Sequence, residues 1–314
     1  RKYKPKVSRL KYGVGVPRNI PEALQLDKEN GNTFCHDAVK SEMKDLFDLE
    51  CFEVKDEGFR IGNEYQKTTL TMLFSVKQDL RRQCRLVAGG HLVDPLDLDA
   101  YSSTVKGISV KLLHVISNKA GLTQLCGDVS LAFVNAYTKE LVYAIAGPEF
   151  GEHCGKTVII RKALYGLCSS AERWHAHFAD TLQGLGFKQT RFDNDVWMKS
   201  NENGKTYDYI CTHVDDFCIC SKEPDQIMKQ IEKIYTVKSI GPPDYYLGND
   251  FKKDKKGRWC IGCKKYLKES LKRVESMFGC LKKYSNPSET GDHPEMDTSE
   301  LLNDEDHRKF QMLI

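Results

Sequence analysis

Apolar residues recur along this chain with two periods, one helical and one extended. Residues 33–49, TFCHDAVKSEMKDLFDL, carry apolar side chains three or four positions apart, which predicts an amphipathic helix. Residues 107–121 repeat the pattern, with Gly121 as the end signal and one predicted face formed by Ile108, Leu112, Val115 and Ile116. Shorter or more polar helices are predicted at residues 224–236 and 264–278.

A third amphipathic helix is predicted over residues 169–187. Its apolar stripe is Trp174, Phe178 and Leu182, and two glycines end it. Ser169 and Glu172 have the spacing of a capping box at the helix start.

Strand-forming residues occupy the remaining apolar segments. Residues 68–77 and 84–88 predict two strands joined by a charged turn, and the apolar run that ends at Asp128 predicts a third. Residues 207–220 predict a hairpin, and DYYLGNDF at 244–251 is also strand-like. Strands and helices in this irregular order favour an α+β fold over a regular series of β-α-β units.

The predicted hairpin, YDYICTHVDDFCIC, has two adjacent carboxylates in its middle. Asp215 and Asp216 repel each other, and Asp is unfavourable in strands. One interpretation is a polar hairpin tip, because Asp is readily accommodated in tight turns. The other is a functional site, because the apolar flanks put the pair at the edge of a core, where a divalent cation would relieve the repulsion. Asp128 is the candidate third carboxylate of such a two-metal site, which could direct phosphoryl displacement.

Composition limits the classes of protein. The 314 residues are 40% hydrophobic and 29% charged, which is ordinary for a globular protein of one or two domains. No apolar run approaches the about 18 residues of a membrane span, and no secretory signal is recognisable. The twelve cysteines are therefore interpreted as reduced thiols of an intracellular protein. Cys260 and Cys263 form a C-x-x-C pair without a second pair at suitable spacing, so a zinc site is not favoured.

The net charge of +3 conceals segments of opposite character. Residues 1–12 carry six basic side chains and no acidic one. Residues 251–285 carry twelve Lys and Arg against three acidic residues, a net of +9, and residues 286–306 carry eight Asp and Glu with no Lys or Arg. The +9 segment suits a phosphate backbone, whose binding releases counterions. A solvated, lysine-rich helix face is the alternative interpretation.

Six segments resemble, in order and spacing, the reverse transcriptases of copia-type long-terminal-repeat retrotransposons (Pseudoviridae). HVDD at 213–216 matches the family pattern Y-V-D-D, and GDVSLAFVNAYTKELVY at 127–143 matches D-V-x-x-A-F-L-N-G-x-L-x-E-x-V-Y. Each motif is weak alone, whereas the ordered set is specific and covers roughly residues 33–314. The other segments are FSVKQDLRRQCRLVAGG at 74–90, KALYGLCSSAERWHAHFADTLQGLGF at 162–187, YYLGNDF at 245–251 and KKYLKESLKRV at 264–274.

The resemblance implies an α+β, right-hand polymerase fold of fingers, palm and thumb, with an antiparallel palm sheet flanked by helices. The chain would divide into a basic linker (1–32), fingers and palm (33–250), a basic thumb (251–285) and an acidic tail that begins a connection (286–314). The integrase and ribonuclease H segments of the same polyprotein would lie outside this chain. Since it also lacks an initiator Met, it is expected to be a fragment without RNA-degrading activity.

The resemblance also implies the catalytic residues. Asp128 and Asp215 would bind two Mg²⁺ ions, with Mn²⁺ as an alternative, and Asp216 would be the adjoining catalytic carboxylate. Such ions lower the pKa of the primer 3′-hydroxyl and neutralise the leaving pyrophosphate. The implied function is that of an RNA-directed DNA polymerase, with deoxynucleoside triphosphates and a primed RNA or DNA template as partners.

Further site residues follow from the same resemblance. Phe133 matches an aromatic residue under the incoming sugar, whose bulk would exclude a 2′-hydroxyl; an ordinary core Phe is the alternative. Lys77 and Arg85 match cations that hold the triphosphate, although Arg81 and Arg82 lie in the same turn. The remaining implied contacts are Tyr165 and Gly166 beside the nascent base pair, Leu247 and Gly248 in the primer grip, and Lys264, Lys265, Lys268, Lys272 and Arg273 along the template–primer backbone.

The chain departs from the family pattern at several positions. His213 replaces the Tyr before the Asp pair and is interpreted as a packing substitute rather than a general acid. Other departures remove positive charge near the implied nucleotide path, so an inactive, template-binding remnant of the same fold is the alternative function. Gln83, Gly89 and Cys168 each replace a Lys of the family pattern, whereas His91 replaces an aromatic residue and Ala171 a Pro.

A third interpretation is a two-metal nuclease, which is disfavoured because a nuclease needs neither Phe133 nor the fingers cations. The resemblance also implies a cytoplasmic location in virus-like particles of the retroelement, without membrane association or secretion.

Overall fold

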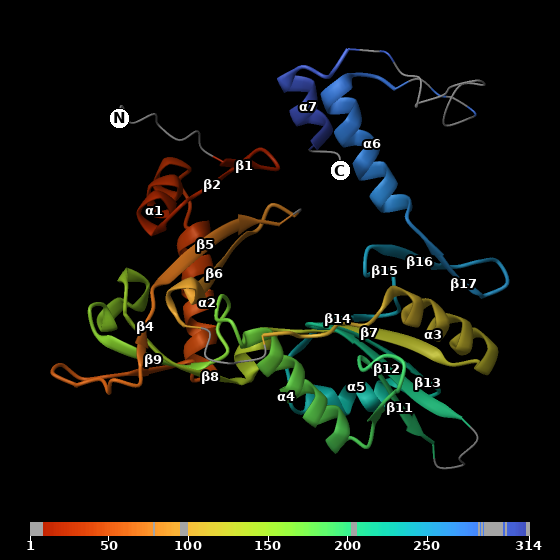
Figure 1. Ribbon diagram of the computed structural model, residues 1–314, viewed down its shortest axis with the longest axis horizontal. Coiled ribbons are helices and arrows are strands. Elements are labelled where there is room, and N and C mark those ends of the chain that lie inside the picture. Colours follow the sequence, from red (N-terminus) through yellow and green to blue (C-terminus); the bar gives the residue numbers. More distant parts are fainter. Residues whose placement is uncertain are drawn as a thin grey trace. The chain divides into compact units, whose positions relative to one another are not determined.

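The computed structural model describes residues 9–77, 79–94, 100–201, 206–281, 283, 285, 298 and 300–311. The chain forms two compact units, Arg1–Gly241 and Pro242–Ile314 (Figure 1). The predicted boundary between palm and thumb, at residue 250, lies inside the second unit. Most of the acidic segment 286–306 lies outside the described residues.

Part of the predicted linker 1–32 is structured. Strand β1 (Arg9–Lys11) pairs with β2 (Val14–Val16), and both precede helix α1 (Ile20–Glu29). The Asn19 side chain caps α1 by accepting a hydrogen bond from the Glu22 backbone N–H at 3.0 Å. The buried carboxylate of Asp27 accepts hydrogen bonds from the Cys35 and His36 N–H groups, which begin the next helix.

That next helix, α2 (Phe34–Asp48), packs against a hairpin and a four-stranded sheet. Its residues Met43 and Leu46 are buried in one core with Leu86 and Val142, as the apolar spacing predicts. The sheet has the order β3-β9-β8-β4, and its β4–β8 pair is parallel. The strands of the sheet are β3 (Phe52–Val54), β4 (Gln66–Lys67), β8 (Tyr137–Ile145) and β9 (Thr157–Lys162). The hairpin consists of β5 (Leu70–Val76) and β6 (Arg82–Ala88). The short 3₁₀ helices are η1 (Gly90–Leu92), η2 (Ala132–Asn135) and η3 (Pro148–His153).

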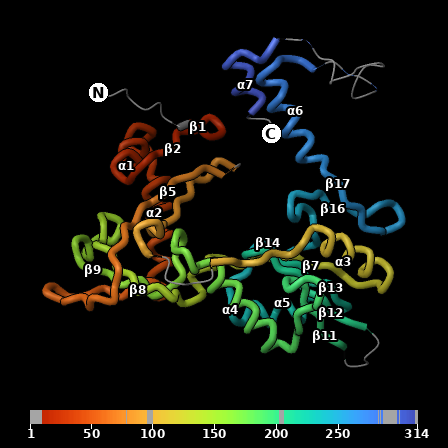
Figure 2. Tube along the Cα trace, in the orientation of Figure 1, coloured from red at the N-terminus to blue at the C-terminus, as the bar shows by residue number. Residues whose placement is uncertain are grey.

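The second sheet of this unit is six-stranded and antiparallel throughout, in the order β10-β11-β12-β13-β7-β14. Figure 2 shows β7 beside β13 although they are far apart in sequence. The strands are β7 (Thr123–Val129), β10 (Lys188–Gln189), β11 (Val196–Ser200), β12 (Tyr207–His213), β13 (Asp216–Ser221) and β14 (Val237–Gly241), and the helices that pack on them are α3 (Gly107–Ala120), α4 (Ser170–Gly184) and α5 (Pro224–Glu232).

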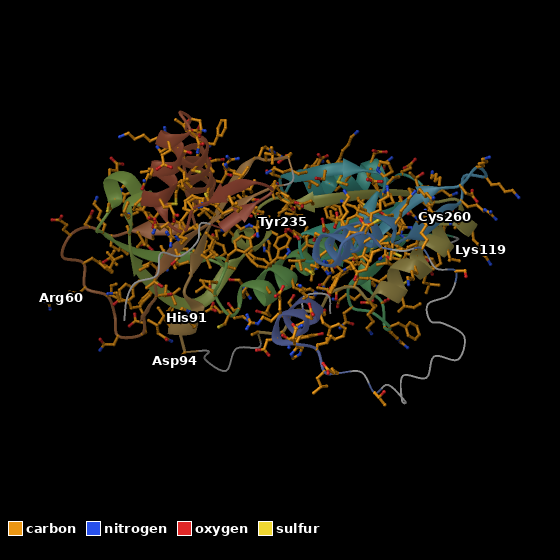
Figure 3. All side chains as sticks on the ribbon, turned by 90° about the horizontal axis from the view of Figure 1, so that it is seen from above. Arg60, His91, Asp94, Lys119, Tyr235 and Cys260 are labelled. Carbon is orange, nitrogen blue, oxygen red and sulfur yellow. The ribbon has the colours of Figure 1, made fainter. Side chains whose placement is uncertain are left out.

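Different helices cover the two faces of the six-stranded sheet. Ile210 and Phe217 belong to a core that also contains Trp174 of α4, Ile231 of α5 and Tyr235, which Figure 3 labels. Alternate strand residues point to the opposite face, and α3 packs on that side against β13 (Figure 1). The predicted α+β class, with an antiparallel sheet flanked by helices, is confirmed.

The orientation predicted from the α3 stripe is wrong. Ile108, Leu112 and Val115 are exposed, Ile108 by 72%, whereas the sheet side of the helix carries Val110 and Leu113. Both sides of α3 are apolar enough to show helical spacing, so periodicity alone could not tell them apart. Gly121 ends α3 as predicted, with a φ of 60°.

The second unit is a three-stranded antiparallel sheet followed by helices. The Asp250 carboxylate accepts a hydrogen bond from the backbone N–H of Lys265 at 2.8 Å, which fixes the first turn of α6. None of the α6 residues is buried. Along the described parts of the chain, no helix has the length and apolarity needed to cross a bilayer. The elements are β15 (Tyr245–Tyr246), β16 (Asn249–Lys253), β17 (Trp259–Gly262), α6 (Lys264–Phe278) and α7 (Asp304–Gln311).

Candidate active site

Three carboxylates meet at the end of the six-stranded sheet. Asp216, the first residue of β13, is the direct cross-strand partner of Asp128 on β7. Asp215 lies in the turn before β13, and its carbonyl accepts a hydrogen bond from the Val129 N–H at 2.8 Å. All three carboxylates are half-buried. The three predicted catalytic residues therefore lie together, although they come from distant parts of the chain.

The carboxylates perturb one another. Burial raises the pKa of Asp216 to about 6, and the charges of Asp215 and Asp128 add to the effect. Burial, and then Asp215, also raises the pKa of Asp128 above its usual range, against the nearby cations of Lys238, Lys77 and Arg85. A positive charge among these groups would lower both pKa values.

The donor chemistry fits a hard divalent cation. Carboxylate oxygens are the ligands that Mg²⁺ and Mn²⁺ prefer. Within the described ranges, however, no group of three or more His, Cys, Asp or Glu side chains is arranged to hold a metal ion. Because like charges separate, the carboxyl groups of Asp128, Asp215 and Asp216 would have to turn toward a shared cation to bind it.

The turn that carries Asp215 is strained. Val214 has a φ of 57°, in the left-handed region that is unfavourable for a β-branched residue. Such a conformation costs on the order of 1–3 kcal/mol and persists only where surrounding contacts hold it. One such contact is a hydrogen bond of 2.6 Å from the Trp174 indole nitrogen to the Val214 carbonyl. The sequence predicted Trp174 only as part of an apolar stripe.

A cation and two aromatic rings adjoin the carboxylates. The Arg85 guanidinium lies over the Tyr165 ring, 4.8 Å from its centroid. The Phe133 ring lies 4.8 Å from the Tyr165 ring, at an interplanar angle of 42°. The charges of Arg85 and Asp215 both influence the pKa of Tyr165, which burial raises above its usual range. Three predicted site residues therefore share one region with the carboxylates.

The other two arginines of the β5–β6 turn have partners elsewhere. Arg81 forms an ion pair with Asp79 at 2.6 Å, and Arg82 donates to the Leu80 carbonyl at 2.7 Å. Arg85 alone of the three influences the pKa of Asp128. The geometry therefore favours Arg85 for the predicted triphosphate contact.

Gly166 joins the β5–β6 hairpin to this region. The Ala88 N–H donates to the Tyr165 carbonyl at 2.8 Å, so the end of β6 is bonded to the segment before α4. Gly166 has a φ of 95°, and a Cβ there would lie 2.1 Å from the Ala88 carbonyl oxygen. A Cβ at Gly90 would lie 2.0 Å from the Gly166 carbonyl oxygen. Only glycine fits at either position.

A buried carboxylate fixes the start of α4. Glu140 of β8 accepts a hydrogen bond from the Ser169 N–H at 2.8 Å and another from the Ser169 hydroxyl. Burial acts to raise the pKa of Glu140, but the hydrogen bonds from Ser169 and Thr138 outweigh it and lower that pKa. The predicted capping box is therefore wrong, because Ser169 bonds to Glu140 and Glu172 pairs with Lys139 instead. A lone Glu in a strand pattern gave no signal of this role.

The remaining predicted site residues belong to the second unit. Leu247 and Gly248 form the turn between β15 and β16, with φ values of 49° and 76°. All five predicted template–primer cations are exposed on α6. They are Lys264, Lys265, Lys268, Lys272 and Arg273.

Nucleotidyltransferases with a palm domain share the features described above. These features are an antiparallel sheet flanked by helices and a group of carboxylates beside a basic side chain. The chain belongs to the reverse transcriptase (RNA-dependent DNA polymerase) family, whose sequence profile matches residues 59–286. The resemblance drawn from the motifs is confirmed, and the α+β fold with its antiparallel sheet is consistent with a right-hand polymerase.

Similar proteins include yeast retrotransposon products. A transposon Ty5-1 protein of Saccharomyces cerevisiae is 24% identical over 153 residues, which cover 47% of this chain and 49% of that protein. The transposon Ty1-DR1 Gag-Pol polyprotein of the same yeast is 27% identical over 249 residues, 74% of this chain and 14% of the polyprotein. The chain thus spans about half of the first relative and a small part of the second. The copia-type relationship is confirmed.

Among solved structures, a foamy viral protease–reverse transcriptase in complex with double-stranded DNA matches with a TM-score of 0.40 and 16% identity. The match covers 68% of this chain and 33% of that one.

Proposed function

We propose that this chain is an RNA-directed DNA polymerase that adds deoxynucleotides to the 3′-hydroxyl of a primer on an RNA or DNA template. The observation that carries the proposal is the register of β7 and β13, in which Asp128 faces Asp216 beside Asp215. Family membership supports the same reaction. In it, the primer oxygen attacks the α-phosphorus of the nucleotide and pyrophosphate leaves.

Asp128 and Asp215 would hold two Mg²⁺ ions, or Mn²⁺ in their place. Bound there, the metal supplies Lewis-acid activation of the primer hydroxyl and charge neutralisation of the phosphates. Asp216 contributes a third negative charge to the pocket and helps to bind cations there. The raised pKa values of Asp128 and Asp216 support this assignment, because unrelieved carboxylates are what a divalent cation stabilises.

The triphosphate would lie against Lys77 and Arg85, because both cations already act on the carboxylate pocket. Phe133 and Tyr165 would pack against the sugar and base, and the bulk of Phe133 would disfavour ribonucleotides. Leu247 and Gly248 would support the primer end, while the exposed cations of α6 follow the template–primer backbone by charge rather than by sequence. In the cell, the chain would act beside integrase and ribonuclease H segments in virus-like particles, as expected for a copia-type polyprotein.

Primer extension on a primed RNA template tests the proposal. We expect extension with Mg²⁺ and deoxynucleotides, and a loss of at least about a thousandfold in Asp215→Asn, because the substitution replaces a charged oxygen ligand of the metal ions with a neutral amide. Asp208→Asn is the matched control, since it changes a carboxylate on the same hairpin at the far end of β12. Extension that survives Asp215→Asn would contradict the proposal.

The same assay separates two alternatives. An inactive remnant would bind the primed template without extending it, and a two-metal nuclease would cleave the strand. Replacing deoxynucleotides with ribonucleotides in the same reaction tests the role of Phe133, since Phe133→Ala should admit ribonucleotides more readily.

A further inference from the structure

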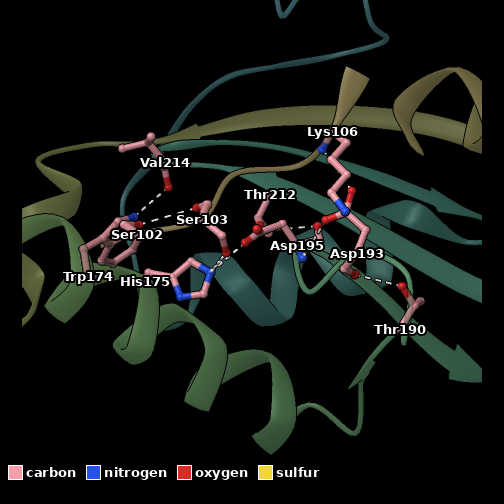
Figure 4. Close-up of polar contacts among 10 residues, drawn as sticks. All are labelled: Ser102, Ser103, Lys106, Trp174, His175, Thr190, Asp193, Asp195, Thr212 and Val214. Atoms are coloured by element: carbon pink, nitrogen blue, oxygen red, sulfur yellow. Dashed lines mark hydrogen bonds and ion pairs between the residues drawn. The ribbon is translucent and has the colours of Figure 1, made fainter. Parts of the chain in front are cut away.

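The strained turn of the catalytic hairpin is held from behind by α4. Trp174 is fully buried, and its ring stacks on Phe178 at 5.1 Å and meets Tyr235 edge-on at 5.5 Å. With the ring fixed in this way, its indole N–H reaches the Val214 carbonyl at 2.6 Å (Figure 4). The carbonyl belongs to the residue immediately before Asp215. A side chain of the buried core therefore holds the turn, in addition to the backbone bond from Val129 to Asp215.

The next residue of α4 holds β12 through a second contact. His175 Nε2 lies 2.6 Å from Oδ1 of Asp195, a carboxylate that is 1% exposed. The Asp195 carbonyl accepts a hydrogen bond from the Thr212 N–H at 2.9 Å, and the Thr212 hydroxyl lies 3.4 Å from both Asp195 oxygens that face it. Thr212 belongs to the strand that leads into the turn. Consecutive α4 residues thus act on one hairpin, Trp174 directly and His175 through Asp195, as Figure 4 shows.

The segment that carries Asp195 is itself anchored. The Asp193 carboxylate accepts hydrogen bonds from the Lys106 N–H at 2.9 Å, the Ser109 hydroxyl at 2.6 Å and the Asp195 N–H at 3.1 Å. Lys106 precedes α3, so the same loop ties the start of α3 to the hairpin. Asp195 cannot shift without breaking bonds on both sides.

A nucleophilic role for this cluster is excluded by its geometry. Ser103, His175 and Asp195 are the residue types of a hydrolytic triad. Such a triad needs the carboxylate on one imidazole nitrogen and the hydroxyl on the other. Here Asp195 and the Ser103 hydroxyl, at 3.4 Å, both approach Nε2. The cluster is therefore suited to holding parts of the chain in place.

We propose that Trp174 and Asp195 are positioning residues, which hold the β12–β13 turn so that Asp215 and Asp216 keep their places opposite Asp128. The inference rests on the proposed polymerase function for its kinetic part. Its structural part, a stiffened hairpin, can be measured without any activity. Two contacts are needed because Val214 would otherwise relax from its left-handed conformation and carry Asp215 with it.

A matched pair of tryptophan variants tests the inference. Trp174→Phe keeps an aromatic ring in the core but removes the N–H donor to Val214. Trp197→Phe makes the same chemical change in the same core, where Trp197 is 1% exposed. Within the residues that the structure describes, the Trp197 side chain makes no hydrogen bond to the turn. Loss of packing is therefore common to both variants, and loss of the turn contact is specific to Trp174→Phe.

Two readouts are needed. Hydrogen–deuterium exchange should show the amides of residues 213–217 exchanging about five- to tenfold faster in Trp174→Phe, as expected when one hydrogen bond is lost, and unchanged in Trp197→Phe. Primer extension should show kcat reduced by a similar factor in Trp174→Phe, with the KM for the template unchanged. Asp195→Asn should act in the same direction, because the neutral amide holds His175 and Thr212 less firmly.

Equal exchange and equal kcat in the two tryptophan variants would overturn the inference. So would a Trp174→Phe variant in which only the KM for the template changes. If the wild-type chain extends no primer, the polymerase proposal fails, whereas the exchange experiment still decides whether Trp174 holds the turn.

Discussion

At the scale of single residues, the cations around the carboxylates differ in what they can do. Arg85 stacks on Tyr165 and acts on the pKa of Asp128, whereas Arg81 is paired with Asp79. The Arg85 guanidinium lies over the Tyr165 ring, and its charge acts on the carboxylates of Glu42 and Asp128. It is therefore held beside the carboxylates, where it can bind the phosphates of a nucleotide. The difference between the two arginines gives the first prediction.

Arg85→Ala should raise the KM for deoxynucleotides by about ten- to a hundredfold, because a charge-assisted bond to a phosphate contributes about 1.5–3 kcal/mol. Arg81→Ala should change that KM by less than about twofold, since an exposed ion pair contributes little. Steady-state extension at varied nucleotide concentration measures both. A larger effect in Arg81→Ala would reassign the contact.

At the scale of elements, α6 is distinctive because it does not pack into a hydrophobic core. It has no buried residue and presents five predicted phosphate-binding cations. Such a helix is stabilised by local contacts, including the Asp250 bond to its first turn, and by whatever it binds.

The α6 cations should therefore control the salt dependence of template binding. Replacing Lys268 and Lys272 with Gln should lower the slope of log affinity against log salt by about 2, since each neutralised phosphate contributes about 0.9 for duplex DNA. Lys229→Gln on α5, an exposed lysine of another helix, is the control and should leave the slope unchanged. Fluorescence anisotropy of a labelled primer–template over a salt series gives the slopes. An unaltered slope in the double variant would argue for a solvated helix face.

The helices and strands also show which parts of the fold could be predicted from the sequence. The spacing of apolar residues predicted the positions of α2, α3, α4 and the catalytic hairpin closely, because apolar residues recur in each with the period of a helix or a strand. The meeting of Asp128 with Asp216 came from the family resemblance, since strand pairing across distant segments leaves no local trace. For the same reason, the sequence could not predict which face of α3 is exposed or that Ser169 bonds to Glu140. Both depend on which element lies opposite.

The contacts of Trp174 show the limit most clearly. Its apolar spacing with Phe178 and Leu182 correctly predicted a buried ring. Nothing in that spacing could indicate that its single polar atom bonds to the Val214 carbonyl. A hydrogen bond to a backbone carbonyl depends on the path of the chain and not on the identity of the residue reached.

At the scale of the whole molecule, stability should depend on pH through the pair His175 and Asp195. The hydrogen bond that the His175 ring donates to the Asp195 carboxylate raises the pKa of His175, although burial opposes it. Burial acts to raise the pKa of Asp195, yet the bond from His175 and its other partners lower it. His175 contributes fully below its ordinary pKa of 6.5, and this contribution is lost as the pH rises through the folded value. The stabilising contribution of Asp195 is complete above its ordinary pKa of 3.8. This contribution is lost as the pH falls through the pKa of the folded state.

The free energy of unfolding should therefore fall more steeply between about pH 5.5 and pH 8.5 in the wild-type chain than in His175→Asn, which has no group to titrate at this position. Urea unfolding at the two pH values measures the difference. Parallel curves for the two proteins would show that the pair adds no pH-dependent stability.

The register between β7 and β13 has a consequence for how the protein can be damaged. Side chains alternate across a strand, so a slip of one residue would send Asp128 to the opposite side of the sheet. No intermediate pairing leaves the carboxylates half assembled. A molecule therefore has either both carboxylates in place or no activity that depends on them. The specific activity of a preparation would then be proportional to the fraction of chains whose β7 and β13 strands are in register.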